Sequence, residues 1–242
     1  MIDWAWVVDH LDELVGRTAQ HFFLAGTSVG IGFGISLALS VWAARRRRLR
    51  AFLVTVSGVL YTIPSLALFA ALVPVTGLSI ATALVPLVLY TLLILMRNIL
   101  AGLDGVAPDV LEAADAMGYG PRGRLVSVEL PLALPLIVGG LRLASVSTIG
   151  LVTVSGILGD RFGGLGFFIF EGHRRSFPTE VLFGAVPSIL LAIAVDLVLQ
   201  AIQRRLTPWA AGSGVVTPGT PTRSTGSGLT GSGTGWARGI GA

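Results

Sequence analysis

Long apolar runs are the feature that most constrains how this chain can fold. They cover about residues 22–44, 51–73, 79–96, 132–158 and 181–202. At 1.5 Å per helical residue, a run of about 20 residues matches the roughly 30 Å hydrocarbon core of a bilayer. Only 12% of the 242 residues are charged, against about 25% in an ordinary soluble domain. We therefore expect an all-α integral membrane protein with about five transmembrane helices.

The two ends of the chain differ from these spans in composition. Residues 1–19 carry apolar positions at helical spacing, with acidic residues between them, which predicts an amphipathic N-terminal helix lying at the membrane interface. We assign residues 1–206 to one transmembrane domain. Residues 207–242 are mainly Gly, Ser, Thr and Pro. Because such a segment buries little apolar surface, a disordered tail is expected there.

The arginines predict how the spans are oriented. With five spans, residues 45–50, 97–131 and 204–205 share one side of the membrane, and most of the arginines that flank spans lie in these segments. Such an excess marks the cytoplasmic side. The N-terminus is then outside, and the C-terminus and its tail are cytoplasmic. The sequence leaves open whether residues 159–176 form a surface loop or a re-entrant segment.

Several kinds of site are excluded by residue type. The chain has no cysteine and no lysine, which rules out disulfides, thiolate chemistry and the lysine-containing phosphate loop of ATPases. Ser155 and Asp160 lack the further partners that an intramembrane hydrolase needs. The net charge of +4 comes from arginines at span ends, which favours membrane flanks over a nucleic-acid surface. We expect no catalytic residue, metal or cofactor, and any ATP chemistry must belong to a partner.

One polar interruption, residues 97–131, is far longer than a simple turn requires. A proline at its start, acidic residues in its first turns and Gly118 at its end predict a helix over 109–117. A second short helix over 122–130 is expected to stop at Pro131. The alanines of the first helix would give a surface that another protein can approach closely.

Seven positions of this loop follow a spaced pattern. They are Glu112, Ala113, Ala114, Gly118, Val128, Leu130 and Pro131. The pattern resembles the EAA loop of permease subunits in bacterial ABC importers, in which isoleucine is usual at the position of Val128. In that family the loop is the coupling helix, which sits in a cleft of a separate ATP-binding subunit. The resemblance thus implies that segment 112–131 docks a transport ATPase.

Further stretches extend this resemblance over about residues 20–203. They are residues 61–69, 89–91, 97–98, 102–103, 129–135 and 163–166. These stretches are similar to permeases of osmoprotectant importers, which carry glycine betaine, choline, carnitine or proline. The resemblance implies a permease of the bacterial inner membrane that forms the pathway with a second copy or a related permease. It also implies two ATP-binding subunits and an extracytoplasmic solute-binding protein as partners.

Residues in the second span are the candidates for the pathway. They are Tyr61, Thr62, Pro64 and Ser65. Proline frees a backbone carbonyl, which is tolerated only beside protein or water, and a tyrosine ring attracts a quaternary ammonium ion. A packing kink explains the same proline equally well. Arg142 and Asp196, which lie inside the fourth and fifth spans, are expected to reach the interface or to pair with each other.

Three other functions are compared with that of an osmoprotectant importer permease. The first is an ABC importer for another small solute, such as an amino acid. The second is a secondary transporter, which would use intramembrane carboxylates and inverted repeats, whereas the first four spans contain no Asp or Glu. The third is a membrane scaffold without transport activity, which would not need the spaced pattern of the long loop.

Overall fold

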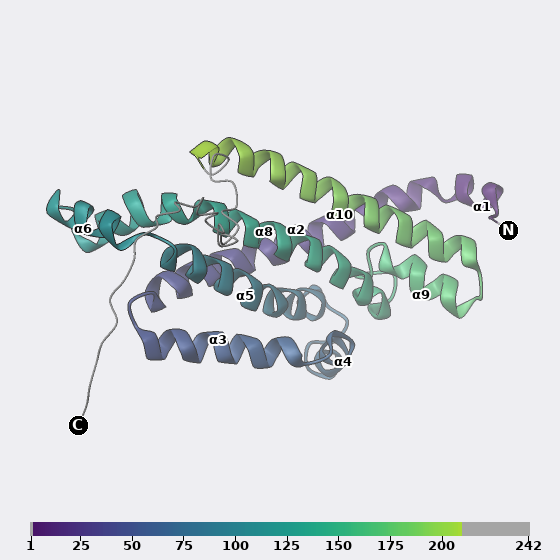
Figure 1. Ribbon diagram of the computed structural model, residues 1–242. Helices are drawn as coiled ribbons and strands as arrows, with labels where there is room; N and C mark the ends of the chain where they lie inside the picture. The colour runs from purple at the N-terminus through teal and green to yellow at the C-terminus, as the bar shows by residue number, and fades with distance from the viewer. Residues whose placement is uncertain (1, 210–242) are drawn as a thin grey trace, which may run out of the picture.

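The chain is built from long apolar helices in the computed structural model, which describes residues 2–209 (Figure 1). Four helices are long and apolar enough to span a membrane. They are α2 (Leu11–Ala43), α5 (Ile80–Asp104), α8 (Leu130–Val154, with a turn of helix on either side) and α10 (Pro178–Leu206). A fifth unit, α3 (Arg47–Thr62) with α4 (Ser65–Thr76), qualifies only as a bent pair. The predicted all-α fold with about five spans is confirmed, whereas almost all of the predicted tail lies outside the described residues.

The second span is not the single helix that its apolar run predicted, because it bends by 91° between α3 and α4. Pro64 has no N–H to continue the ladder, and it forces Ile63 into an extended conformation with ψ 127°. The Tyr90 hydroxyl on α5 donates a hydrogen bond to the Ile63 carbonyl at this break. The break leaves the Ile63 carbonyl without a donor from its own helix, and a side chain of the neighbouring span pairs it instead.

Helix α5 lies in the middle of the bundle, in contact with α2, α3, α4 and α8. Buried side chains form one apolar cluster around its first half and another around its second half. The first cluster includes Leu24, Phe69, Leu87 and Val152, and the second includes Leu95, Ile99, Ala133 and Ile137. A side chain at Gly32 of α2 would overlap Thr91, and one at Gly140 of α8 would overlap Asn98. These glycines therefore allow α2 and α8 to approach α5 closely.

The amphipathic helix predicted over residues 1–19 is found only in part. The short helix α1 (Trp4–Asp9) ends at His10, and the residues from Leu11 onward already belong to α2. No proline lies between Leu11 and the apolar run, so the helix continues without a break. The Trp6 ring packs at 5.2–6.5 Å from the rings of Phe168, Phe177 and Phe183. Helix α1 is thus held by the rest of the chain.

The segment that the sequence left undecided contains a short helix, α9 (Gly166–Arg174), which packs on α10. Figure 1 shows α9 at the same end of the molecule as the N-terminus. His21 fixes the turn before it, because its Nδ1 accepts from the Leu165 N–H (3.2 Å) and its Nε2 donates to the Ile149 carbonyl (2.9 Å). On α9 itself, hydrogen bonding from Arg174 and the neighbouring positive charges hold the pKa of Glu171 below its usual range.

The two charged residues inside the fourth and fifth spans pair with each other, as expected. Arg142 Nε donates to Asp196 Oδ1 (2.9 Å) and Arg142 Nη2 donates to Asp196 Oδ2 (3.0 Å). Gln203 accepts from the same guanidinium (3.2 Å) and donates through Nε2 to the Pro135 carbonyl (3.0 Å). These bonds join α8 to α10 and satisfy a carbonyl within α8.

Replacing Asp196 with Asn should destabilise the protein, because Arg142 would then lie unpaired beside apolar side chains. We expect the melting temperature in detergent to fall by several degrees. The double variant R142Q/D196N should recover most of this loss, because it leaves no unpaired charge. The exposed Asp109→Asn substitution serves as the charge-matched control. Equal melting temperatures for the single and double variants would contradict a structural role for the pair.

Candidate functional site

The candidate site lies at one end of the helical bundle, where α6 (Pro108–Ala116) projects beyond the spans (Figure 1). We call this the arginine-rich end, because it carries residues 45–50, 122–124 and 204–205. Helix α6 starts one residue before the predicted helix and ends one residue earlier. Pro108 opens it and Asp109 lies in its first turn, where the missing N–H and the negative charge are both favourable.

The loop outside the spans is shorter than the predicted 97–131. Helix α5 continues to Asp104, and the continuous helix that contains the next span begins at Pro121 with α7 (Pro121–Arg124). A single π-helical turn (Leu125–Glu129) then leads without a break into α8. The expectation that Pro131 ends a short helix is therefore wrong. Pro131 lies in the first turn of α8, and the wider turn before it reduces the clash that its ring would make.

Gly118 ends α6 with a backbone conformation that favours glycine. Its φ is +84°, and the N–H of Tyr119 donates to the Ala114 carbonyl (3.1 Å) while the N–H of Gly118 donates to the Asp115 carbonyl (3.0 Å). This pair of hydrogen bonds is the Schellman arrangement that closes many helices. Nothing lies within 4 Å of the position that a Cβ would occupy. The constraint at residue 118 therefore comes from the backbone and not from space.

Helix α6 offers a mixed acidic and apolar surface to a partner. Glu112 and Ala113 are exposed, as are Val110 (39%) and Met117 (70%). Positions 110, 113 and 117 share one face of the helix, because they are three and four residues apart. Ala114 is 1% exposed and packs inward. The alanines thus have two roles, with Ala113 on the outer surface and Ala114 holding α6 against the chain.

The remaining residues of the pattern lie at the N-terminal end of α8, away from that surface. Val128, Leu130 and Pro131 are each partly buried. Leu130 packs against the second apolar cluster of the core. The structure therefore divides the seven predicted residues into an exposed part on α6, a cap at Gly118 and an anchoring part on α8.

A chain of ion pairs, which sequence reasoning missed, joins α6 to the spans. Arg124 pairs with Asp115 at the end of α6, and its Nε donates to Glu129 Oε1 (3.0 Å). Arg45 Nη2, just after α2, reaches the same Glu129 oxygen (3.4 Å). We call Asp115, Arg124, Glu129 and Arg45 the Arg124 ion-pair chain. Glu129 is only 9% exposed, so its charge depends on these two arginines.

Helical spacing gave no signal for this contact. Residues five apart on an α-helix point about 140° away from each other, so Arg124 and Glu129 were not expected to meet. The π-helical turn between them reduces that angle and brings the two side chains together. A local irregularity of the helix therefore creates the link.

The four candidate pathway residues lie together at the bend between α3 and α4. The Tyr61 ring is 41% exposed and meets the Tyr90 ring edge to face at 5.4 Å. The Thr62 hydroxyl donates to the Val59 carbonyl of its own helix (2.7 Å), and Ser65 begins α4 directly after Pro64. Tyr61 alone offers an exposed aromatic surface, because Tyr90 is buried, and a role of these residues in the pathway stays a prediction.

The sequence of this chain matches a known family and several characterised relatives. The family described as "binding-protein-dependent transport system inner membrane component" matches residues 30–211. The choline transport system permease protein OpuBB of Bacillus subtilis is 34% identical over 81% of this chain and 89% of its own length. The osmoprotectant import permease protein OsmW of Salmonella typhimurium is 34% identical over 84% of this chain and 96% of its own. The resemblance to osmoprotectant permeases is thus confirmed.

Solved structures share the fold. A chain in an inward-facing structure of the MetNI methionine ABC transporter superposes with a TM-score of 0.72 over 80% of this chain and 96% of that chain, at 22% identity. A chain of an amino acid ABC transporter with histidines gives a TM-score of 0.68 at 16% identity, over 85% and 99% of the two chains. These identities support the shared fold alone. The family match, the relatives and the apolar helices identify this chain as a multi-pass membrane protein that belongs to the inner-membrane components of binding-protein-dependent transport systems.

Proposed function

We propose that this chain is the permease subunit of an ATP-driven importer for osmoprotectants such as glycine betaine, choline, carnitine or proline. The observation that carries this proposal is the identity of about one third, over four fifths of the chain, with permeases named for choline, carnitine and osmoprotectants. The exposed helix α6 supplies the surface that such a subunit offers to a separate ATPase.

The arginine-rich end is proposed to face the cytoplasm, with the N-terminus outside and the C-terminus inside. The distribution of arginines supports this orientation. An ABC ATP-binding subunit would then contact Glu112 and the apolar face of α6. A second permease, identical or related, would complete the pathway, and an extracytoplasmic binding protein would deliver the solute to the end that carries α1 and α9.

The Arg124 ion-pair chain is proposed to transmit the movement of the ATPase to the spans. A displacement of α6 pulls on Asp115, and Arg124 passes this force to Glu129 at the foot of α8. The contact of Arg45 with Glu129 extends the link to the end of α2. ATP binding would thereby shift the permease between inward- and outward-facing states, because the bound ATPase favours one of the two.

At the bend of the second span, the exposed ring of Tyr61, supported edge to face by the buried Tyr90, is proposed to contact the solute during its passage. An aromatic face attracts a quaternary ammonium group by about 0.5–2 kcal/mol, which suits weak and transient binding. An amino acid is the alternative solute class. A secondary transporter is less well supported, because Asp196 in α10 is already neutralised by Arg142.

Replacing Gly118 with Val should uncouple the ATPase, because a β-branched residue is strained at φ +84° and would unwind the end of α6. We expect loss of ATP-driven uptake and weaker co-purification of the ATPase subunit. Gly118→Asn should keep most of the activity, because asparagine tolerates this conformation. Gly120→Val is the matched control, since Gly120 has an ordinary φ of −69°. Normal uptake by G118V would contradict the coupling role of the loop.

Replacing Arg124 with Gln should separate ATPase binding from transport. The outer surface of α6 stays intact, so the ATPase subunit should still co-purify. The number of solute molecules imported per ATP hydrolysed should fall severalfold in proteoliposomes, because α6 loses its link to α8. Arg122→Gln, which removes a neighbouring exposed charge, should leave the ratio unchanged. A normal ratio for R124Q would show that force travels by another route.

Uptake of labelled glycine betaine, choline, carnitine and proline should identify the solute in a host that lacks its own importers. We expect at least one to accumulate at high osmolarity when the chain is expressed with its partners. Tyr61→Ala should lower the maximal rate for a quaternary ammonium solute by roughly 2- to 10-fold, whereas Tyr61→Phe should stay within about twofold because the ring is kept. If none of the four accumulates, the osmoprotectant assignment fails and only the general importer function stands.

A further inference from the structure

An arginine-lined cleft opens between the start of α3 and the end of α5, outside the region of α6. Its volume is about 650 Å³. The charged residues that line it are Arg45, Arg47, Arg50, Arg97 and Asp104. Four cationic side chains thus face a single carboxylate. Such an excess of positive charge is typical of an anion-binding site, provided that the arginines are not already neutralised within the chain.

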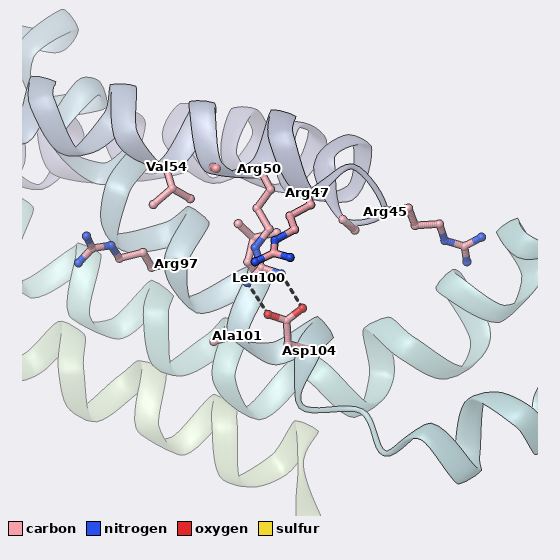
Figure 2. Close-up of a pocket in the computed structure, with 10 residues that line it drawn as sticks. Arg45, Arg47, Arg50, Val54, Arg97, Leu100, Ala101 and Asp104 are labelled. Carbon is pink, nitrogen blue, oxygen red and sulfur yellow. Dashed lines mark hydrogen bonds and ion pairs between the residues drawn. The ribbon is translucent and has the colours of Figure 1, made fainter.

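The arginines of the cleft differ in how far they are neutralised. Arg50 is paired with Asp104, with Nη1 to Oδ1 at 2.7 Å, and Arg45 extends toward Glu129. Figure 2 shows Arg47 beside Arg50 near Asp104, whereas Arg45 points away and Arg97 lies farther along α5. Over residues 2–209, neither Arg47 nor Arg97 has an ion-pair partner. Both are exposed, and their charges are available to a ligand.

The start of α3 adds further hydrogen-bond donors to the same place. Among residues 2–209, no side chain caps this helix at Arg46, so the first N–H groups of α3 have no side-chain acceptor there. Helix N-termini favour negative charge. The free guanidinium of Arg47 and the uncapped helix start therefore act on the same side of the cleft.

The cleft also has an apolar wall, as expected of a site at the membrane surface. The accessible side chains of Val54 and Ala101 line it, and the apolar surface of α3 continues with the exposed Phe52. Arg97 directly follows the apolar run of α5 and lies about 10 Å deeper along that helix than Asp104. An arginine at this depth needs either a partner or contact with the lipid headgroups. A soluble anion would satisfy the charges but would leave the apolar wall uncovered.

We propose that this cleft binds an acidic phospholipid from the leaflet at the arginine-rich end. The phosphate accepts hydrogen bonds from Arg47 and the start of α3, and Arg97 secures the charge on the membrane side. An acyl chain lies along Val54 and Ala101. The proposal concerns lipid binding by the permease itself, so it does not depend on which solute is transported or on how the ATPase docks.

The test uses the full chain purified in detergent, with lipid retention measured by native mass spectrometry. Phosphatidylglycerol is compared with phosphatidylcholine of the same acyl chains. The wild-type chain should retain phosphatidylglycerol preferentially, and R47Q/R97Q should lose roughly 20-fold in affinity. R204Q/R205Q, which removes the same charge from the end of α10, should behave like the wild type. The melting temperature and elution volume of each variant establish that it is folded.

A soluble competitor separates the two sources of phosphate. Glycerophosphoglycerol, which is the headgroup without acyl chains, should fail to displace the lipid at millimolar concentration. Full displacement at that concentration would show a soluble-anion site and overturn the lipid assignment. Equal retention of phosphatidylglycerol by R47Q/R97Q and the wild type would also overturn it. Equal retention together with lost co-purification of the ATPase subunit would reassign the cleft as a protein-docking surface.

Discussion

The fold depends on one constraint, which is that backbone polar groups inside a bilayer must be paired within the protein. Regular helices meet this requirement by themselves, whereas prolines disturb the hydrogen-bond ladder. Side chains of neighbouring spans donate to backbone carbonyls beside two of the prolines. The Tyr90 hydroxyl donates to the Ile63 carbonyl at the bend of the second span, and Gln203 donates to the Pro135 carbonyl in α8. These two hydrogen bonds tie neighbouring spans to each other, so that the helices of the bundle are linked by polar contacts as well as by packing.

Because the spans contact one another in this way, a short helix outside the membrane can transmit movement to them. Helix α6 has little buried surface of its own, and its shape depends on the cap at Gly118 and on the packing of Ala114. Arg124 and Glu129 then tie it to the foot of α8, and Arg45 ties that foot to the end of α2. A partner that moves α6 would therefore move spans, while the proposed solute contact at Tyr61 lies at the bend of another span. Docking and transport can be separate in space and still be coupled.

Much of this could be predicted from the sequence, because bilayer spans and helix ends leave strong local signals. Apolar runs gave the five spans, and Pro108 with Gly118 placed α6 to within one residue. Two predicted helix ends were wrong, because the effect of a proline depends on the residues that surround it. Pro64 breaks its span where Tyr90 can pair the Ile63 carbonyl, whereas Pro131 is accommodated after a π-helical turn. The pairing of Arg124 with Glu129 had no signal, since it depends on that irregular turn.

The absence of cysteine from this chain permits the most direct test of its central claim, that α6 is a cytoplasmic docking surface for an ATPase. A single cysteine introduced by Ala113→Cys would be exposed on α6, whereas one introduced by Ala114→Cys would be buried. A membrane-impermeant maleimide should label the first variant only after the cells are opened, and bound ATPase subunit should suppress that labelling. Labelling in intact cells, or labelling that the ATPase subunit leaves unchanged, would contradict the account.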